Sequence, residues 1–74
     1  MKFIPYIDEH DIEHQVDASN IMFTETFPLG SPDENGVFPI MGTRICLATK
    51  VGGYVISKEP AHVVWDRVSK ALDL

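Results

Sequence analysis

The pattern with the most specific chemical meaning is His10-Asp11-Ile12-Glu13-His14, which spells H-x-x-E-H. In inverted zinc-peptidase motifs both histidines lie on one helix face and bind zinc, while the glutamate acts as general base. Residues 8–17 show no apolar stripe at helical spacing, and a 74-residue chain is too short for a peptidase cleft. We therefore predict an acidic loop with no metal and no cofactor. Weak zinc or nickel binding by His10 and His14 is the alternative.

The other reactive side chains lack the neighbours that catalysis needs. Cys46 falls in an expected strand without a helix N-terminus or a cation beside it, so we expect a small apolar packing residue. His62 lies on the exposed side of an expected helix, with no activated nucleophile near it. Gly52-Gly53 indicates a hairpin turn and Lys58 stands outside any Walker pattern, so no phosphate-binding loop is expected. We predict that the protein is not an enzyme.

The charge is distributed unevenly along the chain. The net charge is −5, which disfavours nucleic acid as a partner. Residues 1–41 carry Lys2 against eight carboxylates, whereas residues 42–74 carry five cations against three carboxylates. The first half is therefore expected to attract a partner with a basic surface. In the second half, a single aromatic residue with three cations gives a minimal form of an aromatic platform for single-stranded nucleic acid: Tyr54 with Arg44, Lys50 and Lys58.

The length and composition indicate one small domain, residues 1–74. A chain of this size buries about 60% of the surface that it exposes when unfolded, so we expect marginal stability. No apolar run approaches the roughly 18 residues of a membrane span, so no membrane contact is expected. The chain has one cysteine and no recognisable signal peptide, which predicts a cytoplasmic location.

The apolar periodicity predicts an α+β fold: a small antiparallel sheet of three to five strands covered on one face by a single C-terminal helix. Strands are expected at residues 2–7, 12–17, 21–27, 43–49 and 54–57, with a turn at Val51-Gly52-Gly53. A helix is expected to begin after Pro60. Its apolar stripe, which includes Val64, Trp65, Val68 and Leu72, should pack on Ile21, Phe23, Ile45, Leu47 and Ile56. Its solvated face should carry His62, Asp66, Arg67, Ser69 and Lys70.

A long Pro/Gly-rich loop is predicted at residues 28–42, with a tight turn at Asn35-Gly36. It contains the apolar run Val37-Phe38-Pro39-Ile40-Met41 in a segment expected at the surface. Two interpretations are open. The run covers the second face of the sheet or adds an edge strand, or it binds a partner. The second face, for which Met22, Thr24, Thr26 and Cys46 are candidates, would otherwise be solvated or paired with another chain.

If the loop binds a partner, apolar anchors and acidic rim residues are expected to share the contact. The anchors are Val37, Phe38, Ile40 and Met41, and the carboxylates are Glu9, Asp11, Asp33 and Glu34.

The second half of the chain resembles the FlbD-like family, very small proteins of flagellar operons with relatives in bacterial and phage genomes. The similar segments are Gly42-Thr43-Arg44-Ile45-Cys46-Leu47, Gly53-Tyr54-Val55-Ile56-Ser57-Lys58-Glu59 and Ala61-His62-Val63-Val64-Trp65. With Asp17-Ala18-Ser19-Asn20-Ile21, the resemblance spans residues 17–27 and 42–72, while residues 8–17 and 28–41 depart from it. It implies a small accessory or regulatory protein and brings no catalytic residues.

These observations favour a small non-enzymatic regulatory or adaptor protein that binds a larger protein. Its most concrete form is a bacterial or phage modulator of a host machine such as the transcription apparatus, with RNA polymerase as the partner. Two alternatives belong to other classes. One is a nucleic-acid-binding regulator that uses the basic second half, and the other is a structural homo-oligomer, such as a homodimer joined through edge strands.

Overall fold

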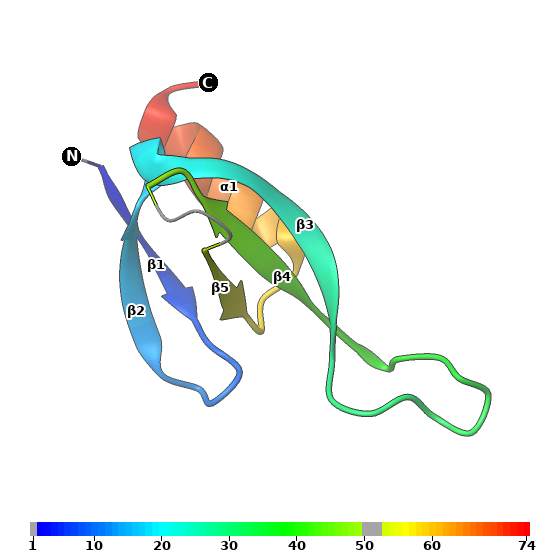
Figure 1. Cartoon of the computed structure of the whole chain (residues 1–74). Coiled ribbons are helices and arrows are strands. Elements are labelled where there is room, and N and C mark those ends of the chain that lie inside the picture. The colour runs from blue at the N-terminus through cyan, green and yellow to red at the C-terminus, as the bar shows by residue number, and fades with distance from the viewer. Residues whose placement is uncertain (1, 50–52) are drawn as a thin grey trace.

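A computed structural model describes residues 2–49 and 53–74 of the chain. The elements, in order, are β1 (Phe3–Ile7), β2 (Glu13–Asp17), the 3-10 turn η1 (Ala18–Asn20), β3 (Ile21–Leu29), β4 (Ile40–Leu47), β5 (Tyr54–Ser57) and α1 (Ala61–Leu72). Strands β1 and β2 form an antiparallel hairpin, and β3, β4 and β5 form a separate antiparallel sheet (Figure 1). The predicted α+β fold with one C-terminal helix is confirmed, although the strands divide into two sheets.

The hydrophobic core lies where the two sheets meet the helix. Its buried members are Ile4, Tyr6, Val16, Ala18, Ile45, Val64 and Val68. In the strands expected at residues 2–7 and 12–17, Ile4, Tyr6 and Val16 point inward, whereas Ile12 lies before β2 and is 55% exposed. Sequence reasoning gave these three residues no place against the helix, because pairing between distant segments cannot be read from local periodicity.

Two aromatic residues expected in the core lie at the surface instead. Trp65 is 49% exposed and Phe23 is 48% exposed. On the helix, Val64 and Val68 point straight at the core, so Trp65, one residue further round, lies on the flank of the stripe. In β3, the pairing register shifts between Ile21 and Phe23, and this irregularity turns the two side chains to opposite faces.

The prediction that Ile56 packs in the core is wrong, as the register of the β4–β5 pair shows. Ile56 pairs with Arg44, whereas Val55 pairs with the fully buried Ile45. Because successive side chains alternate between faces, Val55 points toward the helix and Ile56 away from it. Of the turn expected at residues 51–53, only Gly53 belongs to the described residues, and its carbonyl accepts a hydrogen bond from the Leu47 amide at 3.1 Å.

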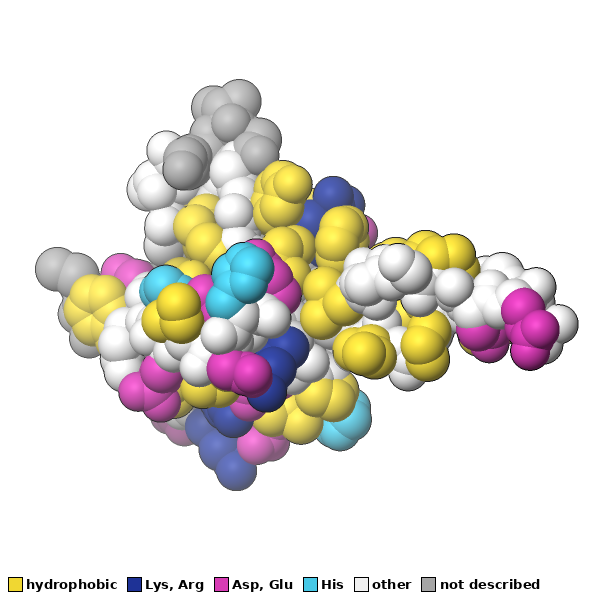
Figure 2. Space-filling model, turned by 90° about the horizontal axis from the view of Figure 1, so that it is seen from below, with side chains coloured by type: hydrophobic (Ala, Val, Ile, Leu, Met, Phe, Trp, Pro, Cys, Tyr) yellow, Lys and Arg dark blue, Asp and Glu magenta, His cyan; other side chains and the backbone are white. Residues whose placement is uncertain are grey.

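The connection between β3 and β4 is shorter than the predicted loop at 28–42. Pro28 and Leu29 continue β3, and β4 begins at Ile40, so residues 30–39 form the loop. Proline is tolerated there because β3 is an edge strand and needs no outward donor. The two strands therefore carry a hairpin arm, residues 28–41, away from the body (Figures 1 and 2). The longest Cα extent of the molecule is 43 Å, against 25 and 22 Å in the other directions.

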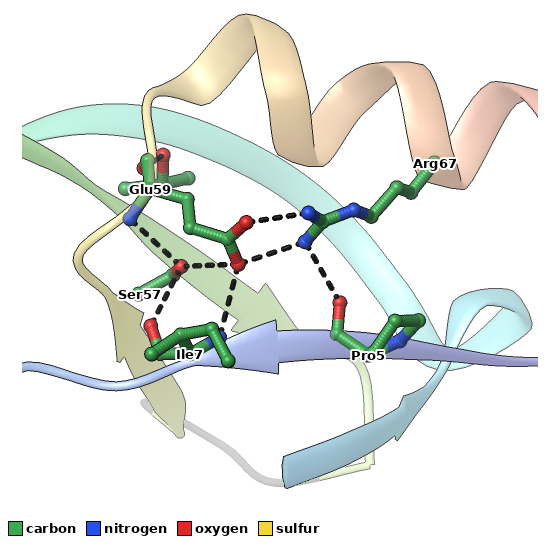
Figure 3. A network of polar contacts seen from close by, with 6 residues as sticks. Pro5, Ile7, Ser57, Glu59 and Arg67 are labelled. Carbon is green, nitrogen blue, oxygen red and sulfur yellow. Dashed lines mark hydrogen bonds and ion pairs between the residues drawn. The ribbon is translucent and has the colours of Figure 1, made fainter. Parts of the chain in front are cut away.

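The Glu59 carboxylate joins the helix to both sheets (Figure 3). Arg67, expected in solvent, instead donates from Nη1 and Nη2 to the two carboxylate oxygens at 2.7 and 2.5 Å. The same carboxylate accepts a hydrogen bond from the Ile7 amide at 2.9 Å, and Arg67 Nη1 also donates to the Pro5 carbonyl at 3.1 Å. The hydrogen bond from Arg67 first, and then the bond from the Ile7 amide, hold the pKa of Glu59 below its ordinary value.

We predict that Ile45→Ala lowers the free energy of unfolding by about 2–5 kcal/mol, because Ile45 is fully buried at the centre of the core. Trp65→Ala should cost at most about 2 kcal/mol, since half of that side chain remains in water. Urea denaturation of both variants measures the difference. A larger loss for Trp65→Ala than for Ile45→Ala would contradict this placement of the core.

We also predict that Glu59→Gln lowers the stability at pH 7 by about 1.5–3 kcal/mol, because Arg67 loses its charged acceptor. The folded-state pKa of Glu59 is depressed, so its contribution is present above the unfolded pKa, about 4.3, and is lost as the pH falls through the folded value. Unfolding curves from pH 7 to 3 should therefore converge for the wild type and the variant. Glu34→Gln, at the exposed arm tip, is the control, and parallel curves for Glu59→Gln would refute the pH linkage.

Candidate functional site

The tip of the arm is organised by Asp33. Its Oδ1 accepts hydrogen bonds from the amides of Asn35 and Val37, both at 2.9 Å. Its own amide donates to the Val37 carbonyl at 2.8 Å, and its carbonyl accepts from the Gly36 amide at 3.0 Å. Gly36 has a φ of 78°, which glycine adopts without strain, so the turn expected at Asn35-Gly36 is confirmed.

The tip between β1 and β2 repeats this construction around Asp8. Its Oδ1 accepts from the amides of His10 and Ile12 at 2.8 and 2.9 Å, and its amide donates to the Ile12 carbonyl at 3.0 Å. Asp11 takes the position of the turn glycine, with a φ of 65°. The sequence signal is Asp-Glu-His-Asp-Ile beside Asp-Glu-Asn-Gly-Val, a short repeat that sequence reasoning missed.

The four predicted contact carboxylates therefore have different roles. Asp33 holds the arm tip together, and Asp11 forms an ion pair with Lys58. Glu9 and Glu34, each directly after the organising aspartate, are exposed on the two tips. The structure thus leaves one outward-facing glutamate on each tip.

The arm presents exposed apolar side chains behind its acidic tip (Figure 2). Val37 is 59% exposed, Ile40 56% and Met41 43%, while Phe38 is partly buried. Every core residue and every apolar residue packed against the core lies outside 22–44. The arm therefore extends the β3–β4 pairing away from the body and does not fold back over the sheet, and exposed apolar groups of this kind mark binding surfaces.

The H-x-x-E-H segment does not form the helix that a zinc peptidase needs. His10 lies in the tip, whereas Glu13 and His14 are adjacent residues of β2 and point to opposite faces. His14 Nε2 lies 2.7 Å from Asp8 Oδ2, and its ring stacks on Tyr6 with centroids 5.2 Å apart. Within residues 2–49 and 53–74, no three His, Cys, Asp or Glu side chains gather as a metal site.

Lys50 lies outside the described residues, and the described cations of the second half do not form an open basic surface. Each of the four that the structure describes has a carboxylate partner: Arg44 with Glu25, Lys58 with Asp11, Arg67 with Glu59, and Lys70 with Asp66. Free cationic groups supply most of the nonspecific affinity for nucleic acid. Their pairing here gives no support to the nucleic-acid alternative.

The three-stranded sheet has an outer face turned away from the helix. This outer sheet face consists of Phe23, Glu25, Phe27, Arg44, Cys46, Tyr54 and Ile56. Cys46 is half-buried in a hollow of about 320 Å³ that Phe23, Arg44 and Tyr54 also border. Thr24 and Thr26, two of the residues expected here, pair with Ile45 and Thr43 and point to the helix side instead.

Comparison with protein-family models, curated proteins and solved structures finds no match to this chain. The resemblance to the FlbD-like family therefore stays a prediction. In the part of the chain that the structure describes, no helix has both the length and the apolar character needed to cross a membrane.

We predict that the protein purified without added metal carries no stoichiometric zinc, because the histidines of the motif are engaged in a turn and a strand. The double variant His10→Ala with His14→Ala should lose the exposed contacts of His14 with Asp8 and of His10 with Glu9 and the stacking of His14 on Tyr6, and should therefore melt slightly below the wild type. Elemental analysis and thermal melting measure both points. Zinc at one equivalent in the wild type, lost in the double variant, would restore the metal interpretation.

Proposed function

We propose that this protein is a non-enzymatic adaptor or regulator that binds a larger protein through its hairpin arm. The observation that carries the proposal is the exposure of Val37, Ile40 and Met41 on a segment that contributes nothing to the core. A free hairpin that leaves large apolar groups in water is stabilised when a partner covers them. Binding energy in such contacts concentrates in a few apolar or aromatic anchors.

The charge of the arm and of the whole chain favours a partner with a basic surface around an apolar groove. Glu34 stands at the arm tip, Glu9 stands at the equivalent tip, and the net charge is −5. Carboxylates at the rim of an interface attract a basic partner and raise the association rate more than the affinity. A bacterial or phage regulator of a host machine such as RNA polymerase, acting in the cytoplasm, is the form that the FlbD-like resemblance and the single cysteine support.

The first test uses full-length protein to capture partners from bacterial lysate and then measures binding kinetics with the purified partner. We expect Ile40→Ser to weaken the complex by about 2 kcal/mol or more while the protein stays folded, because Ile40 is 56% exposed and outside the core. Ile12→Ser is the matched control, since Ile12 is 55% exposed on the other tip. Full binding by Ile40→Ser and loss with Ile12→Ser would move the contact to the β1–β2 tip.

The charge on the tips is tested separately. Glu9→Lys with Glu34→Lys should slow association and flatten its dependence on salt, with little change in the dissociation rate. Neither side chain is needed for the turns, which Asp8 and Asp33 organise. An unchanged association rate at low salt would remove the electrostatic part of the proposal and leave the apolar contact in place.

A further inference from the structure

The outer sheet face carries aromatic groups that nothing in the described chain covers. Phe23 is 48% exposed and Tyr54 is 50% exposed, and Met22 beside them is 64% exposed. They border the hollow of about 320 Å³ over Cys46. Helix α1 covers the opposite side of the sheet, so among the described residues this face has no second layer, and a second chain can supply one.

A charged pair is held at a defined place on this face. Arg44 lies between two rings, with its guanidinium carbon 5.5 Å from the centroid of Phe27 and 5.4 Å from that of Tyr54. Its cross-strand partner in register is Glu25, with which it forms an ion pair. Cation–π contacts on both sides fix the guanidinium against the sheet. The face therefore presents a positive and a negative group side by side, one on β4 and one on β3.

We propose that two copies of this chain pair through the outer sheet face, around a two-fold axis that runs along the strands between β3 and β4. Such an axis brings Arg44 of each copy over Glu25 of the other. A two-fold axis running across the strands would instead set Arg44 over Arg44 and Glu25 over Glu25. Like charges facing each other are strongly unfavourable at an interface, so the charges select the first arrangement.

Side-chain size agrees with the same axis. Phe23 on β3 is in register with Cys46 on β4, so each Phe23 ring lies over the small Cys46 of the second copy and its hollow. An axis across the strands at the level of Arg44 and Glu25 would instead set each Phe23 ring over Phe27 of the other copy, one large ring against another. Large groups over small ones allow two sheets to interdigitate. A 74-residue domain also gains from such burial, because its own core is small.

The axis has a consequence for the arms. A rotation about a line parallel to the strands leaves the strand direction unchanged, so both arms project from the same end of the pair. If the arm binds a partner as proposed above, the pair is bivalent, and the second contact forms at a raised effective concentration. Only this consequence rests on the proposed function; the pairing itself does not.

The experiment is sedimentation equilibrium of the full-length chain from about 1 µM to about 1 mM, with circular dichroism to check folding. We expect a reversible dimer of twice 8.3 kDa. Glu25→Arg alone and Arg44→Glu alone should each raise the dissociation constant at least about tenfold. Mixed together, the two single variants should form a heterodimer, because each reversed charge then faces its opposite on the other chain.

The mixing experiment distinguishes an ion pair that acts between two copies from one that acts only within a single chain. Mixing the two variants cannot restore a contact within one chain. Phe23→Lys, which alters no ion pair, should also prevent pairing, and Ile12→Ser on the β1–β2 tip, where Ile12 is 55% exposed, should leave it intact. A wild type that stays monomeric at about 1 mM, or single variants that fail to pair when mixed, would overturn the proposal. So would variants that dimerise like the wild type.

Small-angle scattering tests the axis. With both arms at one end, the dimer should be little longer than one chain, whose longest Cα extent is 43 Å. A dimer much longer than this would place the arms at opposite ends and refute the axis along the strands. If the dimer forms but Ile40→Ser still binds the captured partner normally, the pairing stands and the function proposed for the arm fails.

Discussion

The contact on which the fold depends is the Glu59 carboxylate. In the part of the chain that the structure describes, the β1–β2 hairpin and the three-stranded sheet share no paired strands, so contacts other than a continuous ladder must join them. Glu59 follows β5, receives both ends of the Arg67 guanidinium from the helix and accepts the amide at the end of β1. A half-buried carboxylate with a bidentate arginine and a backbone donor is well compensated for its lost hydration.

Two small polar side chains form further hydrogen bonds between the elements that meet at Glu59. Ser57 Oγ donates to the Ile7 carbonyl at 3.0 Å, and Thr43 Oγ1 donates to the Glu59 carbonyl at 2.8 Å, and both side chains are fully buried. Unpaired, they would each destabilise the fold, so their hydrogen bonds determine how the strands meet. These buried hydrogen bonds around Glu59 contrast with the arm, which extends beyond the core with its apolar side chains exposed.

The arm and the outer sheet face differ in shape and in charge, and therefore suit different partners. The arm is narrow, apolar along its length and acidic at its tip, which suits insertion into a groove with basic edges. The outer sheet face is broad and carries opposite charges in register, which suits a copy of itself. Since Phe27 of this face directly precedes the arm, the two surfaces are continuous, and pairing would also determine where the arms point.

The amino-acid sequence by itself determined the elements, because strand alternation, the proline before the helix and the Asn-Gly turn are local signals. It located Val64 and Val68 on the packed helix face and the apolar run of the arm. Only the tertiary structure decided which face Phe23 and Ile56 occupy, since a register shift between Ile21 and Phe23 and the pairing of β5 set those directions. The contacts of Arg67 and Glu59 likewise depended on folding, because the Pro5 carbonyl that accepts from Arg67 and the Ile7 amide that donates to Glu59 come from the other end of the chain. Strand continuation through Pro28 was hidden for a similar reason: proline breaks a central strand but not an edge strand, and edge position is a property of the assembled sheet.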